Sequence, residues 1–445
     1  MKKNALKLFL NQRRFDLIFK YLYVKNPTDF NKVAYLENIR AFNNFYELNP
    51  SDKIPKNSAT DFINSFNSLI KSISENQYDN SKGLIPIGKN GEITDGAHRL
   101  SVCSALGLDV TLIDDTIYNE YYPYSFFRKK GMNEEIMDYG ALEYVKLNPN
   151  AYIVNIHSVV DTHYDNEIEK LLEKYGFIYY KKFIKLNLNA YVHLKRISYG
   201  YFWEKDSQWI GTKDNLFVGA KQHAKKSLGR FPLRAYVYVC DDISKILEVK
   251  QEIRDLVKIG NFSVHINDTH DEAICLAETY FNYNTLNYIK RVPYYIEDKL
   301  FNDRLDNLKS ILIENKIEQD NICCVGSTPL NICGVRESED IDYLSIDGKF
   351  RYEDSLFSPH DSQLLNYPYN KEEIVTNPKN YFYYRGFKFI TLDVLLKMKI
   401  KRHEYPKDYK DIILIYKIKI NSLILLMKNY LLRNKYIVKI KNIFK

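Results

Sequence analysis

Two spacings of apolar residues alternate along the central part of the chain. Alternating or continuous apolar runs occupy 151–160, 177–188, 234–240 and 261–268, whereas 166–175 and 243–260 carry apolar residues three or four positions apart. The first spacing is typical of strands and the second of amphipathic helices. This alternation predicts a mixed α/β domain between about residues 126 and 295.

The patterns on either side predict further parts. The first 125 residues read as helical segments followed by a strand–turn–helix unit. After residue 295 we expect a helix over Asp303–Asn315, a strand at NICCVG, a short helix, a strand at EDIDYLSI, the hairpin NYFYYRGFKFI and a helix opened by Thr391. The expected fold class is therefore a multidomain chain with α/β and α+β parts, bounded at 1–125, 126–295, 296–416 and 417–445.

Composition narrows the class of protein. A chain of 445 residues is too long to fold around a single hydrophobic core. Its content of 45% hydrophobic and 27% charged residues is typical of a globular protein. Lys plus Arg at 64 against Asp plus Glu at 56 gives a net charge of +8, which is too small over this length to indicate a dedicated nucleic-acid-binding protein. Six cysteines without a CxxC pair, and no signal peptide or run of about 20 apolar residues, favour a cytoplasmic location.

The tail differs from the rest of the chain. No acidic residue follows Asp411, while lysines and arginines alternate with apolar residues at helical spacing. Two interpretations fit residues 417–445. The segment is either a C-terminal helix packed on the preceding domain, or a basic amphipathic helix in peripheral contact with the anionic inner surface of the membrane.

The strongest candidate chemistry lies between residues 325 and 342. Asp340 and Asp342 stand two apart on a predicted strand, so their carboxylates share one face and repel each other unless a cation lies between them. Carboxylate oxygens favour Mg²⁺, which also accepts phosphate oxygens of a substrate. Upstream, Gly326 lets the backbone approach a phosphate closely, and Ser327 offers a hydroxyl at the start of a short helix. The segment predicts a site for a nucleoside diphosphate or triphosphate.

The order Gly-Ser, then about a dozen residues, then Asp-x-Asp resembles the nucleotidyltransferase fold of the DNA polymerase β-like superfamily, over about 302–416. The later Lys407-Asp408 and Lys410-Asp411 pairs support the resemblance. It implies that Gly326 and Ser327 hold the phosphates of ATP or CTP. It also implies that Asp340 and Asp342 bind two Mg²⁺ ions that orient an attacking hydroxyl and stabilise the leaving group.

Members of that superfamily usually carry a third carboxylate on a later strand. Asp361 is our choice for it, with Asp347 second. Arg336 and Lys388 are candidates for neutralising phosphate charge, although each could equally be a surface cation. The structural alternative for the entire site is a turn followed by an exposed acidic strand.

A second candidate lies in the first part of the chain. Residues 83–87 read as a strand, 89–91 as a turn and 92–94 as a short return strand, after which Asp95-Gly-Ala-His-Arg99 opens a helix. We expect Asp95 to cap this helix, Gly96 to allow the tight entry, and His98 and Arg99 to clamp a phosphate in the first turn. A cluster that only caps the helix is the alternative.

The stretch 85–108 resembles the ParB-like (ParB/sulfiredoxin) fold, whose Asp-Gly-x-His-Arg signature it matches. In that family the motif contacts nucleotide phosphates, and its members include small-molecule kinases and CTP-dependent DNA clamps. A kinase needs a general base, for which Glu37 is a candidate. No helix-turn-helix segment follows the motif, which argues against a DNA clamp.

The middle part concentrates potential ligands at its last strand. His265, Asp268 and His270, followed by Asp271 and Glu272, could bind a metal ion. Alternatively, Asp268 or Thr269 caps the next helix and Glu272 completes a capping box. Lys250 and Arg254, four apart on the preceding helix, face either an anion or solvent.

These observations lead to one main functional hypothesis and two alternatives. The first is a Mg²⁺-dependent transferase that moves a nucleotidyl or phosphoryl-linked group onto a small hydroxylated acceptor, for instance in capsular polysaccharide synthesis, with a kinase activity in the ParB-like part. The second is a toxin or antiviral nucleotidyltransferase that modifies tRNA or protein. The third is a nucleotide-sensing or DNA-binding module whose transferase site is degenerate.

Overall fold

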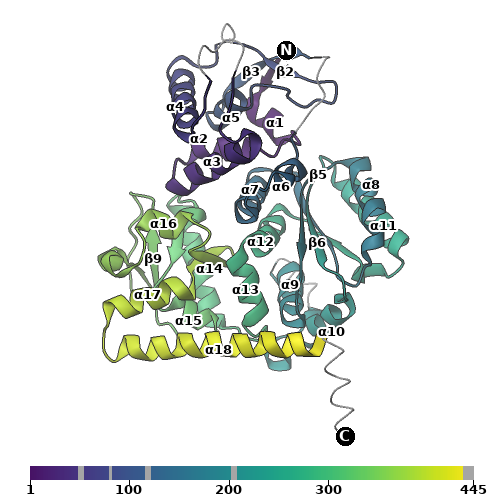
Figure 1. Cartoon of the computed structure of the whole chain (residues 1–445). Coiled ribbons are helices and arrows are strands. Elements are labelled where there is room, and N and C mark those ends of the chain that lie inside the picture. Colours follow the sequence, from purple (N-terminus) through teal and green to yellow (C-terminus); the bar gives the residue numbers. More distant parts are fainter. Residues whose placement is uncertain (49–54, 80–82, 116–121, 202–207, 434–445) are drawn as a thin grey trace. The chain divides into compact units, whose positions relative to one another are not determined.

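The computed structural model describes residues 1–48, 55–79, 83–115, 122–201 and 208–433, and over 421–433 it describes only the course of a helix. The chain is a mixed α/β protein with three small sheets (Figure 1). Its contacts divide it into two compact units. The first comprises 1–156, 161–183 and 234–277, and the second comprises 157–160, 184–233 and 278–445. The predicted boundary at 125 falls inside the first unit, and the one at 295 falls inside the second.

The first unit contains two sheets, of order β1-β3-β2 and β5-β6-β4-β7. Strand β3 pairs antiparallel with β1 and parallel with β2, and β4 lies antiparallel between β6 and β7. The elements of this unit are β1 Lys2–Asn4, α1 Ala5–Leu10, α2 Leu17–Lys25, α3 Asp29–Asn43, α4 Ala59–Asn76, β2 Ile85–Ile87, α5 Ala97–Ala105, β3 Asp109–Asp114, α6 Tyr124–Lys129, α7 Glu134–Leu147, β4 Ala151–Ile156, α8 Asp165–Tyr175, β5 Phe177–Ile184, β6 Leu233–Val239, α11 Ile243–Val257 and β7 Val264–Ile266.

The strand–turn–helix segment of the first unit differs from the prediction in its return strand and in the cap of its helix. The turn closes through hydrogen bonds from Gly88 N to Glu92 O (2.8 Å) and from Thr94 N to Pro86 O (3.1 Å). Residues 92–94 form a single bridge, between Ile87 and Ile93, instead of a return strand. The chain then turns at Gly96, which has a φ of +78° and occupies the N-cap position of α5 without any side-chain cap. The expectation that Asp95 caps this helix is therefore wrong.

The second unit contains the five-stranded sheet β10-β9-β8-β12-β11. The strands β8 and β9 pair antiparallel, β10 runs parallel to β9, and β12 runs parallel to β8. Helix α12 (His270–Phe281) leads into this unit from the first. The elements of the second unit are α9 Leu188–Gly200, α10 Val218–Ser227, α13 Tyr283–Arg291, α14 Lys299–Glu314, β8 Ile322–Cys324, α15 Thr328–Ile332, β9 Ile341–Ser345, β10 Phe357–Pro359, α16 Lys371–Thr376, β11 Tyr381–Tyr384, β12 Phe387–Ile390, α17 Leu392–Arg402 and α18 Lys407–Arg433.

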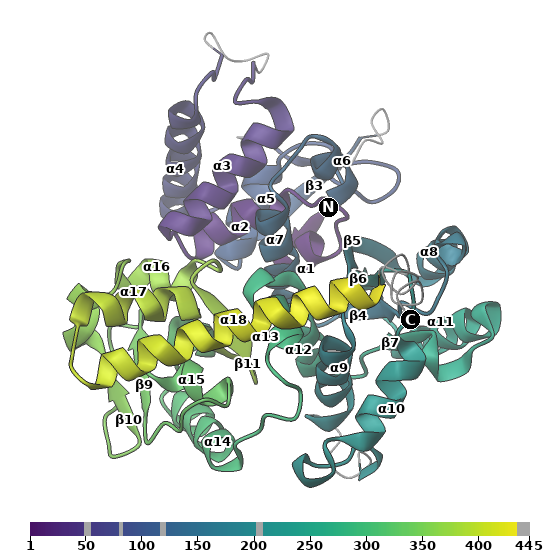
Figure 2. The same ribbon diagram turned by 60° about the horizontal axis from the view of Figure 1, so that its bottom comes forward.

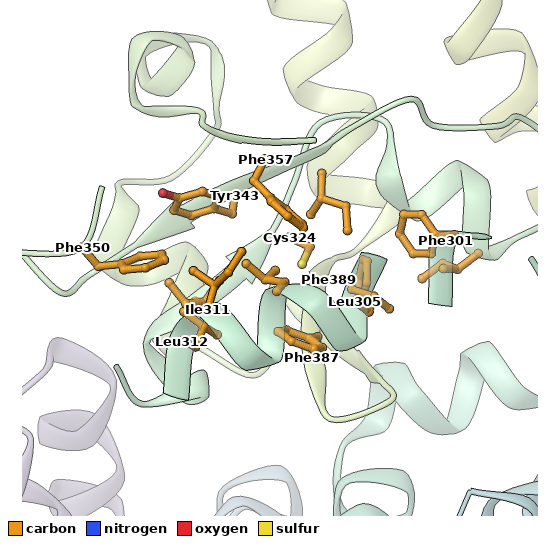
Figure 3. Packing of buried hydrophobic residues seen from close by; sticks show 14 of the residues in the cluster. Phe301, Leu305, Ile311, Leu312, Cys324, Tyr343, Phe350, Phe357, Phe387 and Phe389 are labelled. Atoms are coloured by element: carbon orange, nitrogen blue, oxygen red, sulfur yellow. The ribbon is translucent and has the colours of Figure 1, made fainter. Parts of the chain in front are cut away.

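Alternation along the strands builds the core of the second unit. Leu305, Leu308 and Leu312 of α14 pack against strand residues such as Ile341 and Tyr343, and all five side chains are buried. The side chains labelled in Figure 3 gather between α14 and the sheet. Because successive strand residues point to opposite faces, burying these two residues of β9 turns the residues on either side of Ile341 away from this core.

Candidate functional site

The turn predicted to hold phosphates, Gly326-Ser327 (the phosphate turn), lies next to the predicted carboxylates Asp340 and Asp342 in the second unit. Strand β8 ends at Cys324, and the Val325 amide then donates a hydrogen bond to the Asp342 carbonyl (2.8 Å). Gly326 is buried and has a φ of +63°; a Cβ placed on it would lie 2.0 Å from Oδ2 of Asp342. Glycine is required here both by the backbone conformation and by the carboxylate. Ser327 follows as the N-cap of the five-residue α15, and its hydroxyl makes no capping hydrogen bond.

Asp340 directly precedes β9 and Asp342 is the second residue of that strand, so only Ile341 separates the two interacting carboxylates. Ile341 between them is fully buried, whereas both aspartates are only partly buried. Partial burial and the neighbouring Asp342 charge raise the pKa of Asp340 above its ordinary value. The two carboxylates therefore repel each other, which is the electrostatic condition for binding a cation between them.

A serine on the neighbouring strand β10 and a histidine just after that strand lie beside Asp342. The register of β9 and β10 pairs Ser358 with Asp342, and the Ser358 hydroxyl donates to Asp342 Oδ1 (3.0 Å). His360 Nε2 lies 3.9 Å from Asp342 Oδ2, and its Nδ1 lies 2.8 Å from the Tyr367 hydroxyl. Burial lowers the pKa of His360. Tyr367 in turn accepts a hydrogen bond from the Gly326 amide, so these side chains link the phosphate turn to the carboxylate strand.

The structure places Asp361 and Asp347 outside this hydrogen-bonded group. Asp361 begins the 3-10 helix after β10, and its Oδ1 accepts a hydrogen bond from Lys371 (2.7 Å). Asp347 lies in the turn after β9, where it accepts from the Lys349 amide (2.9 Å). On strand β10, the position paired with Asp342 carries the hydroxyl of Ser358. The strand register thus gives no support to either carboxylate as the third member of the site.

Two predicted phosphate ligands are already bound by protein groups. Arg336 donates to both oxygens of Asp411 at 2.6 Å. Lys388 is buried, which excludes a surface cation, and donates to the carbonyls of Asp320 (2.7 Å) and Val375 (3.1 Å). Lys407 was not predicted as a ligand, yet it is exposed and its charge acts on both Asp340 and His360. Lys407 is therefore an exposed lysine near the two carboxylates.

The Asp residues of the two Lys-Asp pairs are structural. Asp408 and Asp411 are buried and both contact Lys399 of α17, at 3.1 and 2.9 Å. Arg402 also donates to both carboxylate oxygens of Asp408 (2.7 and 3.0 Å). These ion pairs fix the start of α18 to α17, and thereby hold Lys407 near Asp340.

The motif of the first unit lines a cavity of about 630 Å³. All five residues from Asp95 to Arg99 contribute to its wall. His98 Nε2 lies 3.0 Å from the Tyr35 hydroxyl, and burial together with neighbouring cations holds its pKa well below the ordinary value. The imidazole is therefore neutral at neutral pH. Arg99 Nη2 lies 3.6 Å from Asp95 Oδ2.

Buried charges form another part of the cavity wall. Arg14 and Lys20 both bind Asp16, with Nη2 and Nζ at 2.9 and 2.8 Å from Oδ2. Burial would raise the pKa of Asp16, but the two cations outweigh it and hold that pKa far below its ordinary value. Glu37, the predicted general base, is not part of the cavity wall; its carboxylate binds Arg40 and the Asn133 amide instead.

Comparison of the chain with protein-family models, curated proteins and solved structures yields no match. The resemblances to the nucleotidyltransferase and ParB-like folds rest on the residues alone.

The histidine-rich segment of the middle part caps a helix. His265 Nε2 lies 2.7 Å from Glu272 Oε1, and Glu272 Oε2 accepts from the Asp268 amide (3.1 Å). The Thr269 hydroxyl accepts from the Glu272 amide (3.2 Å), and His270 points to the carbonyl of Lys146 (3.4 Å). Across the described ranges, no group of three or more His, Cys, Asp or Glu side chains is arranged to hold a metal ion.

The predicted basic tail belongs largely to α18. Up to residue 420 this helix packs against α13, α15 and α17 (Figure 2). The remaining side chains of the predicted segment lie outside the described residues. Within the part of the chain that the structure describes, every helix falls short of what crossing a membrane requires.

Proposed function

We propose that the second unit carries a Mg²⁺-dependent nucleotidyl transfer site. The observation that carries the proposal is the approach of Gly326 to Asp342, which sets the backbone turn directly against the carboxylate strand. A nucleotide whose phosphates lie on this turn would meet the carboxylates of Asp340 and Asp342. Ser327 and Lys407 then supply a hydroxyl and a positive charge for its phosphates.

Asp340 and Asp342 would hold the metal ion. Mg²⁺ is commonly bound through one or two carboxylates and substrate phosphate oxygens, and the partly buried pair at the start of β9 fits this pattern. Because Ser358 occupies the position paired with Asp342, we propose one ion held by the two aspartates rather than the two ions that the resemblance implies. When bound, the ion polarises the phosphate that is attacked.

The proposed reaction joins the nucleotide to a small hydroxylated acceptor. The acceptor oxygen forms a bond to the α-phosphorus, and the bond from that phosphorus to the bridging β-oxygen breaks. Pyrophosphate leaves, and solvent takes up the hydroxyl proton. Lys407 offsets negative charge on the leaving phosphates.

A second candidate function concerns the first unit. The cavity of about 630 Å³ is lined by aromatic rings and by four cations, each of which pairs with a carboxylate of the same wall: Arg14 and Lys20 with Asp16, Lys56 with Glu47, and Arg99 with Asp95. Cations and aromatic faces together suit a nucleotide, whose phosphates and base need different surroundings. We propose that this cavity binds a nucleotide and supports phosphoryl transfer.

The experiment that tests both functions uses the purified chain with ATP, CTP, GTP and UTP in the presence of Mg²⁺ or a chelator, with products identified by mass spectrometry. A Mg²⁺-dependent release of pyrophosphate that disappears in the Asp340→Asn, Asp342→Asn double variant supports the transfer site. ADP formation that persists in this variant supports the first unit as a kinase. If pyrophosphate release is unchanged in the double variant, the transfer site is wrongly placed.

A further inference from the structure

A cavity of about 300 Å³ lies in the second unit, beside the start of helix α17 and away from the proposed transfer site. Its wall is formed by α13, the start of α17 and the part of α18 near residue 418. Figure 2 shows α18 running past α13, and the two helices are in contact. The volume is at the lower end of the range in which proteins bind small organic molecules.

Among the described residues, one charge in the wall of this cavity has no counter-charge. Arg291 ends α13 and lines the cavity, and its Nε is buried without a hydrogen-bond acceptor among the described residues. The other two charged residues in the wall, Asp393 and Lys419, bind each other. Because this Nε is closed to solvent, a ligand would meet the rest of the guanidinium, and an anion in the cavity would supply the ion-pair partner that Arg291 lacks among the described residues.

The rest of the wall combines apolar and polar side chains, among them two stacked aromatic rings. Tyr288 and Phe382 stack with ring centroids 5.1 Å apart and planes at 19°. The Tyr288 hydroxyl donates to the carbonyl of Ile332 (3.1 Å), which holds the ring in place. Cys333 adds apolar surface, and Asn287 contributes an amide that can both donate and accept.

We infer that this cavity binds a small organic carboxylate with an apolar body about the size of one aromatic ring. The carboxylate pairs with the planar guanidinium of Arg291, and the body packs against Tyr288 and Phe382. Residues 391–393 at the start of α17 line this cavity, whereas Lys399 and Arg402 near the other end of that 11-residue helix bind Asp408. The binding site is thus separate from Asp340 and Asp342, and it does not depend on the proposed transferase function.

The test titrates benzoate, phenylacetate and indole-3-acetate against the full chain carrying Asp340→Asn and Asp342→Asn, without nucleotide, by ligand-observed NMR. We expect saturable binding of at least one probe, weakened about tenfold or more by Arg291→Gln. Arg351→Gln, which changes an exposed arginine of the same unit, should leave the affinity unchanged.

A second variant keeps the test valid if Arg291→Gln fails to fold. Asn287→Trp fills the cavity but retains Arg291, so it should also abolish binding while the melting temperature shows a folded chain. The inference is overturned if no probe binds saturably at millimolar concentrations, or if Arg291→Gln binds as tightly as the parent. Displacement of the probe from the wild-type chain by Mg·ATP would also overturn it, because the cavity would then belong to the transfer site.

Discussion

Gly326 and Asp342 touch so closely that a methyl group on the glycine would lie 2.0 Å from the carboxylate oxygen. This contact joins the turn after β8 to the strand β9. It places the turn directly beside a pair of repelling carboxylates, Asp340 and Asp342.

Because of this contact, the variant Gly326→Ala tests whether the turn holds the phosphates. The new Cβ would be forced into Asp342, and the φ of +63° is unfavourable for alanine. We expect the variant to lose nucleotide turnover and to unfold at a lower temperature. Gly348→Ala is the matched control, because its Cβ would meet nothing within 4 Å. Retention of full turnover by Gly326→Ala would show that the turn does not hold the phosphates.

Asp340→Asn should stabilise the second unit at neutral pH. The pKa of Asp340 is raised in the folded chain, so its ionised form opposes folding once the pH exceeds the ordinary carboxylate pKa. The melting temperature of the variant should exceed that of the wild type near pH 7, and the difference should vanish in acid, where both states are protonated. Added Mg²⁺ should raise the melting temperature of the wild type alone. An Asn variant that is less stable at neutral pH would contradict the raised pKa.

Asp16→Asn should destabilise the first unit strongly. Arg14 and Lys20 would remain buried without their carboxylate, and breaking a buried ion pair on one side costs about 3–5 kcal/mol. Because the pKa of Asp16 is depressed, its stabilising effect is complete above the ordinary carboxylate pKa and is lost as the pH falls through the lower folded value. Urea unfolding at several pH values measures both effects. Asp109→Asn, which changes the exposed partner of Lys2, should cost less than about 1 kcal/mol; equal losses in the two variants would refute the assignment.

Arg99→Gln should weaken nucleotide binding in the first unit. The measurement is calorimetric titration of ATP into a chain that already carries Asp340→Asn and Asp342→Asn, so that the proposed transfer site of the second unit does not contribute to binding. Loss of one charged hydrogen bond to phosphate predicts a reduction of about tenfold or more. Lys71→Gln, at an exposed helix position of the same unit, serves as control and should bind normally. An unchanged affinity in Arg99→Gln would place the nucleotide elsewhere.

The residues of the proposed site differ in how far the sequence predicts them. The strand period of two is sufficient to predict that Asp340 and Asp342 lie close together at the start of β9, and a glycine after a buried strand is a local signal for a tight turn. Ser358 and His360 join the site only because β10 pairs with β9 in one particular register. No pattern within either segment of the sequence predicts the pairing of β10 with β9.

The ion pairs of the site depend equally on tertiary structure. Arg336 and Asp411 are 75 residues apart, and their contact removes the arginine from the set of free phosphate ligands. In the first unit, Gly96 itself occupies the N-cap of α5, so Asp95 lines the cavity instead of capping the helix. Which charges the fold neutralises depends on contacts between residues far apart in the sequence, and no local pattern predicts those contacts.

The most direct test of the central proposal compares pyrophosphate release by the wild type with that of Asp342→Asn and Asp347→Asn, in Mg²⁺ and with the nucleotide that the product analysis identifies. Asp347 lies five residues further along, outside the hydrogen-bonded group around Asp342. The account predicts Mg²⁺-dependent release that is abolished by Asp342→Asn and retained by Asp347→Asn. Release that survives in Asp342→Asn would contradict it.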